Sequence, residues 1–170
     1  MKNIVIVFSN RLFRDEELKK PYEYLSSKGY NIKLASDAMQ EALGKLGMTI
    51  KPDMLAHNIE EKDFDAILFV GGPGTKVFFE DRVIHKIIRN FNEKGKLIGA
   101  ICISPVILAF SGILSQKKAT VWIDGKDTLE KFGATYTGNV VEIHNNIITA
   151  NGPKAALDYA KEVDTYLSGT

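Results

Sequence analysis

The stretch that most constrains the fold is residues 97–105, which read LIGAICISP. An apolar run that ends at a cysteine and is soon followed by a proline indicates a buried strand that turns sharply into a helix. Such a turn requires small neighbours, and Ala100 and Ser104 stand two residues before and after Cys102. Pro105 suits the first helical turn, where its missing N–H costs nothing. The sequence therefore predicts a nucleophile elbow with Cys102 at its apex.

The position of Cys102 leaves two interpretations open. A cysteine at such a turn lies over the first amides of the following helix, which favour the thiolate and lower the thiol pKa. Alternatively, Cys102 is a small buried hydrophobic side chain, which is the usual fate of a free cysteine. It is the only cysteine in the chain, so an internal disulfide and a cysteine-based zinc site are excluded.

Length and composition favour an ordinary globular protein. With 170 residues, 45% of them hydrophobic and 25% charged, the chain is expected to form a single domain over residues 1–170. A net charge of +1, without a basic stripe, argues against a nucleic-acid partner. No apolar stretch is long enough to span a membrane, and the first residues indicate a strand instead of a signal peptide. We therefore expect no membrane partner and a cytoplasmic location.

Apolar β-branched runs alternate with amphipathic segments along the chain, which predicts an open α/β fold with a mostly parallel sheet. Strands are expected at residues 2–9, 31–36, 65–70, 97–102 and 119–123, and a hairpin at residues 140–150 that turns at Asn145 and Asn146. Helices are expected at residues 15–29, 80–94, 106–110, 127–133 and 153–167. Residues 37–63 are interrupted by Gly44, Gly47 and Pro52, and their fold is left open; within them, TIKPDML at residues 49–55 allows either a short edge hairpin or an irregular excursion.

Two finer predictions concern the helices. Asp15 is expected to cap the first helix through its side chain. In the helix at residues 80–94, the spacing places four apolar side chains toward the core: Val83, Ile87, Ile88 and Phe91.

Three motifs together identify a family. Residues 4–25 read IVIVFSNRLFRDEELKKPYEYL, residues 69–74 read FVGGPG, and residues 98–105 read IGAICISP. In this order and spacing, the chain resembles the ThiJ/PfpI superfamily, a class I glutamine amidotransferase-like group, and the similarity extends to NGPKAALDYA at residues 151–160. The resemblance implies a flavodoxin-like three-layer sandwich with a mostly parallel central sheet and a nucleophile elbow. It also implies a homodimer that needs no cofactor and no metal.

The resemblance also implies a catalytic pair of Cys102 and Glu17, the glutamate four residues before Pro21. A carboxyl beside a thiolate should have a raised pKa, because burial and the negative charge disfavour ionisation, and when protonated it can donate a hydrogen bond to sulfur. The residues alone also allow a plainer interpretation, in which Asp15, Glu16 and Glu17 complement the dipole at a helix start. That interpretation suits Glu16.

The glycine run implies an oxyanion hole. By the resemblance, backbone amides of Gly71, Gly72 and Ile103 face a substrate oxygen, with Gly72 as the main candidate, and stabilise charge that develops there. An ordinary glycine turn at the end of a strand is the alternative. The pocket is expected to include Trp122, Asn151 and Ser104.

Histidine is where the chain departs from the family pattern. Relatives carry a histidine at the position of Ile103 or at that of Trp122, and many carry an arginine at that of Asn151. The three histidines of the chain lie elsewhere: His57 in the unclear segment, His85 on what is expected to be a surface helix, and His144 beside the hairpin turn. Each is expected to be structural or solvated, with His144 able to help only if the hairpin folds over the cleft.

Two classes of function remain at this stage. One is a cysteine-dependent, cofactor-independent glyoxalase or deglycase that acts on a small carbonyl substrate such as methylglyoxal, or on early glycation adducts of proteins. The other is a non-catalytic oxidative-stress sensor or holding chaperone that uses the oxidisable Cys102. A PfpI-type cysteine peptidase is disfavoured, because its leaving amine needs a base such as the missing histidine to supply a proton.

Overall fold

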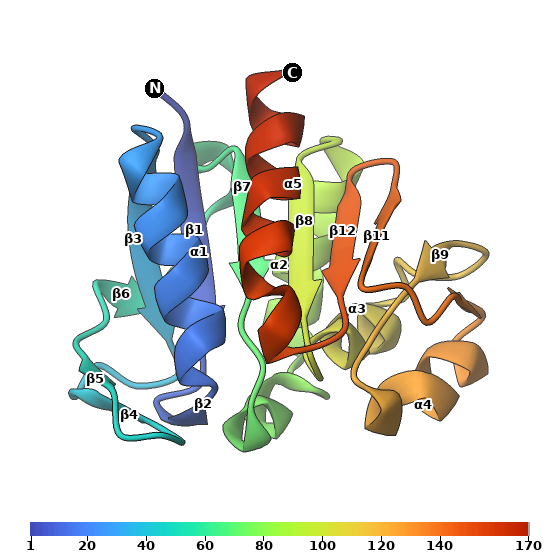
Figure 1. Ribbon diagram of the computed structural model, residues 1–170, viewed down its shortest axis with the longest axis horizontal. Coiled ribbons are helices and arrows are strands. Elements are labelled where there is room, and N and C mark those ends of the chain that lie inside the picture. Colours follow the sequence, from blue (N-terminus) through green and yellow to red (C-terminus); the bar gives the residue numbers. More distant parts are fainter. Residues whose placement is uncertain (170) are drawn as a thin grey trace.

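The computed structural model, which describes residues 1–169, is a three-layer α/β sandwich (Figure 1). The central sheet has seven strands in the order β11-β12-β8-β7-β1-β3-β6, and β11 is the antiparallel one among them. These strands are β1 (Asn3–Phe8), β3 (Asn31–Ser36), β6 (Met54–Leu55), β7 (Ala66–Phe69), β8 (Leu97–Ile101), β11 (Val141–His144) and β12 (Ile147–Ala150). The predicted fold class is therefore confirmed.

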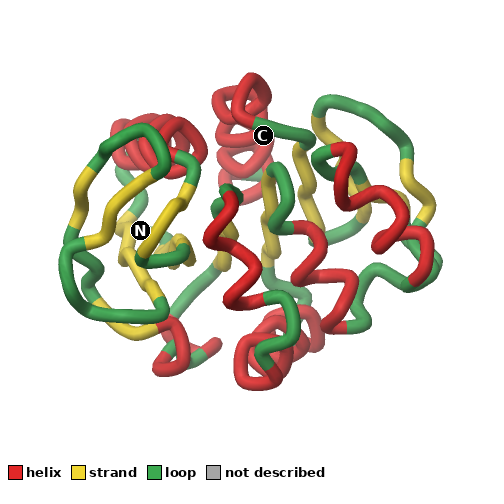
Figure 2. Tube along the Cα trace, turned by 90° about the horizontal axis from the view of Figure 1, so that it is seen from below, coloured by secondary structure: helices red, strands yellow, loops and turns green. Residues whose placement is uncertain are grey.

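Helices cover both faces of the sheet, as the view onto its lower edge shows (Figure 2). The helices are α1 (Asp15–Ser27), α2 (Arg82–Glu93), α3 (Pro105–Ser111), α4 (Lys126–Lys131) and α5 (Ala156–Ser168). In β1, Ile4 and Ile6 face the core beneath α1 and α5, whereas Val5 and Val7 face the core on the side of α2 and α3. Both faces of this strand are buried, which explains its continuous apolar sequence.

The parallel strands bring two turns to one edge of the sheet. The turns after β7 and β8 lie at the lower edge in Figure 1, whereas the chain termini lie at the upper edge. The carboxyl edge of a parallel sheet is where open α/β proteins bind ligands. The glycine run and Cys102 follow β7 and β8 respectively, so this edge contains the candidate site.

Residues 37–63 adopt a specific structure that the sequence left open. A small second sheet pairs β2 (Arg11–Phe13) with β4 (Ala42–Gly44), and β4 forms an antiparallel hairpin with β5 (Thr49–Ile50). Two 3-10 turns follow β6 before β7 begins: η1 (Ala56–Asn58) and η2 (Glu61–Asp63). The segment is thus a hairpin that leads into an edge strand.

Two local predictions are wrong. Residues 119–123 are not one strand, because β9 (Lys118–Ala119) pairs with β10 (Thr135–Tyr136) and a 3-10 turn, η4 (Ile123–Gly125), follows. In α2, Val83 is 44% exposed and Ile84 is buried instead, because Ile84 precedes Ile87 by three residues and Ile88 by four and so shares their buried face of the helix. Further 3-10 turns precede α2 and α5: η3 (Pro73–Phe78) and η5 (Pro153–Ala155).

The hairpin at β11 and β12 is confirmed, with Asn145 at a positive φ of 55° in its turn. No helix within residues 1–169 is long and apolar enough to cross a membrane.

Candidate active site

Cys102 occupies the predicted sharp turn between β8 and α3. Its φ of +64° lies in the left-handed region, which residues other than glycine rarely adopt. The backbone is held on both sides: the Cys102 N–H donates to the carbonyl of Ala150 at 2.9 Å, and its carbonyl accepts from the Trp122 N–H at 2.8 Å. A strained conformation that neighbouring segments enforce is typical of functional sites.

Ser104 stabilises this elbow from inside the core. Its Oγ accepts a hydrogen bond of 2.8 Å from the Ile101 N–H and lies 3.0 Å from the Phe69 carbonyl, to which it donates. The hydroxyl therefore links the ends of β7 and β8. Because Ser104 is fully buried and does not line the cleft, its predicted place in the pocket is wrong.

Glu17 lies in the first turn of α1 and is only 1% exposed. Its Oε1 accepts a hydrogen bond of 3.0 Å from the Gly71 N–H, and its side chain faces the Cys102 thiol. The other oxygen, Oε2, has no hydrogen-bond partner within residues 1–169. The predicted neighbours Cys102 and Glu17 are thus brought together, with one carboxyl oxygen left available for a proton.

Burial raises the pKa of Glu17 to about 7, although its contacts with Cys102 and Gly71 and the charge of Arg14 act in the opposite direction. A carboxyl with a pKa near neutrality is suited to accept a proton and to return it.

The prediction of a lowered thiol pKa is not supported. Burial and the negative charge of Glu17 raise the pKa of Cys102 to about 12, and the amides of Ile103 and Gly72 lower it only in part. The elbow amides act in the predicted direction, but desolvation of the thiolate outweighs them. If Glu17 takes up a proton, its charge no longer opposes the thiolate. The two side chains therefore form a coupled pair, in which ionisation of one opposes ionisation of the other.

The backbone amides predicted to form the oxyanion hole have two different roles. The amides of Gly72 and Ile103 are directed at the Cys102 sulfur, whereas the amide of Gly71 is occupied by Glu17. Gly72 has a φ of +110°, and a Cβ there would lie 2.5 Å from the Leu12 carbonyl oxygen. Gly72 and Ile103 can thus stabilise an oxyanion, and Gly71 instead positions the carboxyl.

A cleft of about 420 Å³ opens beside the sulfur. It is lined by Arg14, Lys45, Gly72, Pro73, Lys76, Phe79, Cys102, Ile103, Trp122, Asp124 and Pro153. Trp122 lies where the prediction placed it. Asn151 does not line the cleft; its N–H donates to the carbonyl of Val140 at 3.0 Å.

None of the three histidines lines the cleft. His57 Nε2 lies 2.6 Å from a carboxylate oxygen of Asp81. His85 is buried, contrary to the prediction of a surface position, and its Nε2 lies 2.7 Å from the Phe79 carbonyl. His144 is the last residue of β11, and its partner Ile147 pairs with Ile98 at the start of β8, whereas Cys102 follows the end of β8. The turn of the hairpin therefore lies at the opposite edge of the sheet, away from the cleft (Figure 1).

Several cleft residues have no place in the sequence prediction. Arg14 lies within the first motif, just before the predicted helix start, and Lys76 lies two residues after the glycine motif, so these positions were the available signals. Lys45 has no such signal, because it lies in the segment whose fold was left open. Within residues 1–169, no cluster of three or more histidine, cysteine, aspartate or glutamate side chains is arranged to hold a metal ion.

The fold and the site together define an α/β sandwich protein with a cysteine at a nucleophile elbow and a buried glutamate beside it. The chain belongs to the DJ-1/PfpI family, whose model matches residues 2–165.

Curated relatives agree with this assignment. An uncharacterized protein of Methanocaldococcus jannaschii is 36% identical over 96% of this chain and 82% of its own length. A glutathione-independent glyoxalase of Caenorhabditis elegans is 30% identical, over 83% of this chain and 75% of its own length. The deglycase PfpI of Pyrococcus furiosus is 27% identical, over 88% and 90%. Two of these three relatives are thus named as enzymes, with a different activity for each.

Among solved structures, a ThiJ/PfpI domain protein from Brachyspira murdochii superimposes with a TM-score of 0.95 at 30% identity. The match covers 99% of this chain and 97% of that protein.

Proposed function

We propose that the protein is a cysteine-dependent glyoxalase or deglycase that acts on reactive carbonyl compounds without a cofactor. The observation that carries the proposal is the contact between the Cys102 thiol and Glu17, a carboxyl whose pKa burial raises to about 7. The activities named for the relatives from Caenorhabditis elegans and Pyrococcus furiosus support it.

The first step is addition of the thiol to an aldehyde carbon. The S–C bond forms as the Glu17 carboxylate accepts the thiol proton, so a free thiolate is not needed at rest. The electron pair of the carbonyl moves onto oxygen, where the amides of Gly72 and Ile103 stabilise it. Glu17 then returns this proton to that oxygen, which gives a hemithioacetal and restores the carboxylate.

In a glyoxalase reaction, a proton then moves from the former aldehyde carbon to the neighbouring carbonyl carbon, and this leaves a thioester on Cys102. Water attacks the thioester, which releases a 2-hydroxy acid and restores the thiol. Glu17 is suited to accept and return these protons, because its pKa lies near neutrality. The net change is the addition of one water, so no oxidant or metal enters the balance.

The alternative of an oxidative sensor is less favoured by the geometry. Oxidation by peroxide requires a thiolate that solvent can reach, and Cys102 is 9% exposed with a raised thiol pKa. A peptidase is disfavoured too, because no histidine lines the cleft. The homodimer and the cytoplasmic location stay predictions.

The decisive experiment measures turnover of methylglyoxal by the wild type and by two variants, Cys102→Ser and Glu17→Gln. Both variants should lose turnover by at least about a hundredfold, since one lacks the nucleophile and the other the proton acceptor. Glu23→Gln removes the same charge from an exposed position of α1 and should keep full activity. No turnover of methylglyoxal or of glycated protein by the wild type, with ready oxidation of Cys102 by peroxide, would favour the sensor instead.

A further inference from the structure

We propose that the cleft selects carbonyl substrates that carry an anionic group, either a carboxylate or a phosphate. This inference rests on the proposed cysteine chemistry at the same site. It is carried by a cationic rim, which we define as Arg14, Lys45 and Lys76.

The charges of the cationic rim come from three separate segments. Arg14 precedes α1, Lys45 lies in the turn between β4 and β5, and Lys76 lies in η3. Among the residues that line the cleft, Asp124 has the one carboxylate side chain. Three cationic side chains and one anionic side chain thus line a cleft of about 420 Å³.

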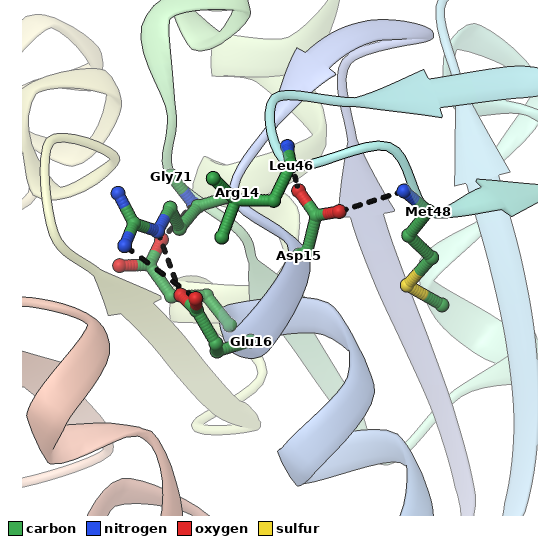
Figure 3. Close-up of polar contacts among 7 residues, drawn as sticks. Arg14, Asp15, Glu16, Leu46, Met48 and Gly71 are labelled. Atoms are coloured by element: carbon green, nitrogen blue, oxygen red, sulfur yellow. Dashed lines mark hydrogen bonds and ion pairs between the residues drawn. The ribbon is translucent and has the colours of Figure 1, made fainter.

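The two lysines of the cationic rim are not paired with a carboxylate. Arg14 is paired with Glu16, since its Nε lies 2.6 Å from Oε2 of that carboxylate (Figure 3). Lys45 and Lys76 form no ion pair or side-chain hydrogen bond with any residue in the described range 1–169. A neutral dicarbonyl compound makes no use of these charges, whereas an anionic group is attracted to them and concentrated near the sulfur.

The turn that carries Lys45 is held in place by Asp15. Its Oδ1 accepts a hydrogen bond of 2.9 Å from the Leu46 N–H, and its Oδ2 accepts one of 2.8 Å from the Met48 N–H (Figure 3). The Lys45 N–H itself donates to the Phe13 carbonyl at 2.8 Å. The carboxylate predicted to cap α1 makes no cap bond and instead binds this turn.

Gly44 leaves the space in which the Asp15 carboxylate binds this turn. A Cβ at Gly44 would lie 2.5 Å from the Asp15 Oδ1, so a larger residue would push the turn away. Asp15 is only 8% exposed, and both of its carboxylate oxygens are used. We therefore assign Asp15 as a positioning residue that holds the Lys45 backbone at the mouth of the cleft.

The first test measures the rates at which Cys102 is alkylated by iodoacetate, which is anionic, and by iodoacetamide, its neutral counterpart of similar size. The ratio of the two rates should fall by about three- to tenfold in Lys45→Gln/Lys76→Gln relative to the wild type, and the difference should shrink at high salt. Lys33→Gln/Lys161→Gln removes the same net charge from exposed positions away from the cleft and should leave the ratio unchanged. An unchanged ratio in the rim variant would overturn the proposal.

The second test separates positioning from simple charge. Removing the negative charge of Asp15 would by itself favour an anionic reagent, so electrostatics alone predicts a higher iodoacetate preference in Asp15→Ala. If Asp15 positions Lys45, the preference falls instead. The milder Asp15→Asn, which can still accept one of the two hydrogen bonds, should lie between Asp15→Ala and the wild type. A higher preference in both variants would refute the positioning role.

Turnover then distinguishes the two anionic groups. Dioxovalerate carries a carboxylate and hydroxypyruvaldehyde phosphate carries a phosphate, and both share the oxoaldehyde group of methylglyoxal. At least one should exceed methylglyoxal in kcat/KM by about tenfold, and that advantage should vanish in the rim variant. Turnover of methylglyoxal with no such advantage would overturn the inference and retain the proposed function. No turnover of any of the three, with the alkylation preference intact, would reject the proposed function and retain an anion-selective cleft.

Discussion

The Gly71 amide donates a hydrogen bond of 3.0 Å to Oε1 of Glu17, and through it the glycine turn after β7 fixes the carboxyl that faces Cys102. A Cβ at Gly71 would lie 2.7 Å from the Cβ of Cys102 and 2.7 Å from the same Glu17 oxygen. The turn, the thiol and the carboxyl therefore depend on one another for their positions.

This packing predicts that Gly71→Ala displaces the pair. We expect a loss of about 1 to 3 kcal/mol in the free energy of unfolding, from overpacking, together with a changed rate of Cys102 alkylation. Gly29→Ala is the control, because Gly29 has a φ of +88° and open space around it. The control should lose stability through backbone strain and keep the alkylation rate. Equal alkylation rates in Gly71→Ala and the wild type would show that the turn tolerates the methyl group.

Glu17 should control the thiol titration. Its charge contributes to raising the pKa of Cys102 to about 12, so Glu17→Gln should lower that pKa by about 1 to 3 pH units. Thiolate absorbance followed against pH measures the effect, with Glu23→Gln as the charge-matched control. A thiol pKa that stays the same or rises in Glu17→Gln would contradict the arrangement.

The same residue should make stability depend on pH. The pKa of Glu17 is raised from 4.5 to about 7, so the folded state binds the proton more tightly than the unfolded state. Stability is therefore lost as pH rises from about 4.5 to about 7, by roughly 3 kcal/mol in total. Glu17→Gln should lack this loss and be more stable than the wild type at pH 8, in urea unfolding. Equal stability of the two proteins at pH 8 would mean that the carboxyl is not desolvated.

Ser104 should matter for stability through the elbow. Ser104→Ala leaves the buried Ile101 N–H without its partner and should cost about 1 to 3 kcal/mol. Ser111 is also buried, but its Oγ only donates to the Leu108 carbonyl within α3, so Ser111→Ala should cost less. Thermal unfolding of both variants makes the comparison, and a smaller loss in Ser104→Ala than in Ser111→Ala would argue against a structural role at the elbow.

His144 should be dispensable for activity. It lies at the sheet edge opposite Cys102, where its Nδ1 accepts a hydrogen bond from the Lys118 N–H at 3.1 Å. His144→Ala should therefore keep kcat/KM on the best substrate within about twofold, since no proton transfer passes through it. A loss near that of Glu17→Gln would require the hairpin to move across the sheet.

The sequence by itself determined the architecture and the elbow, because those signals are local. Residues 97–105 contain the apolar run, the small neighbours and the proline that a strand-to-helix turn requires, and β1 is apolar throughout because both its faces are buried. The position of Glu17 beside Cys102 came from the family resemblance and not from spacing.

Tertiary structure alone decided the chemistry of the site. The direction in which the pKa of Cys102 shifts depends on how deeply the sulfur is buried and on the charge of Glu17. Neither quantity can be deduced from residues 97–105 alone. Asp15 likewise reads as a helix cap, but the hairpin at β4 and β5 offers it two amides from more than thirty residues away. Lys45 reaches the cleft by the same packing, because contacts between distant segments are made only when the chain has folded.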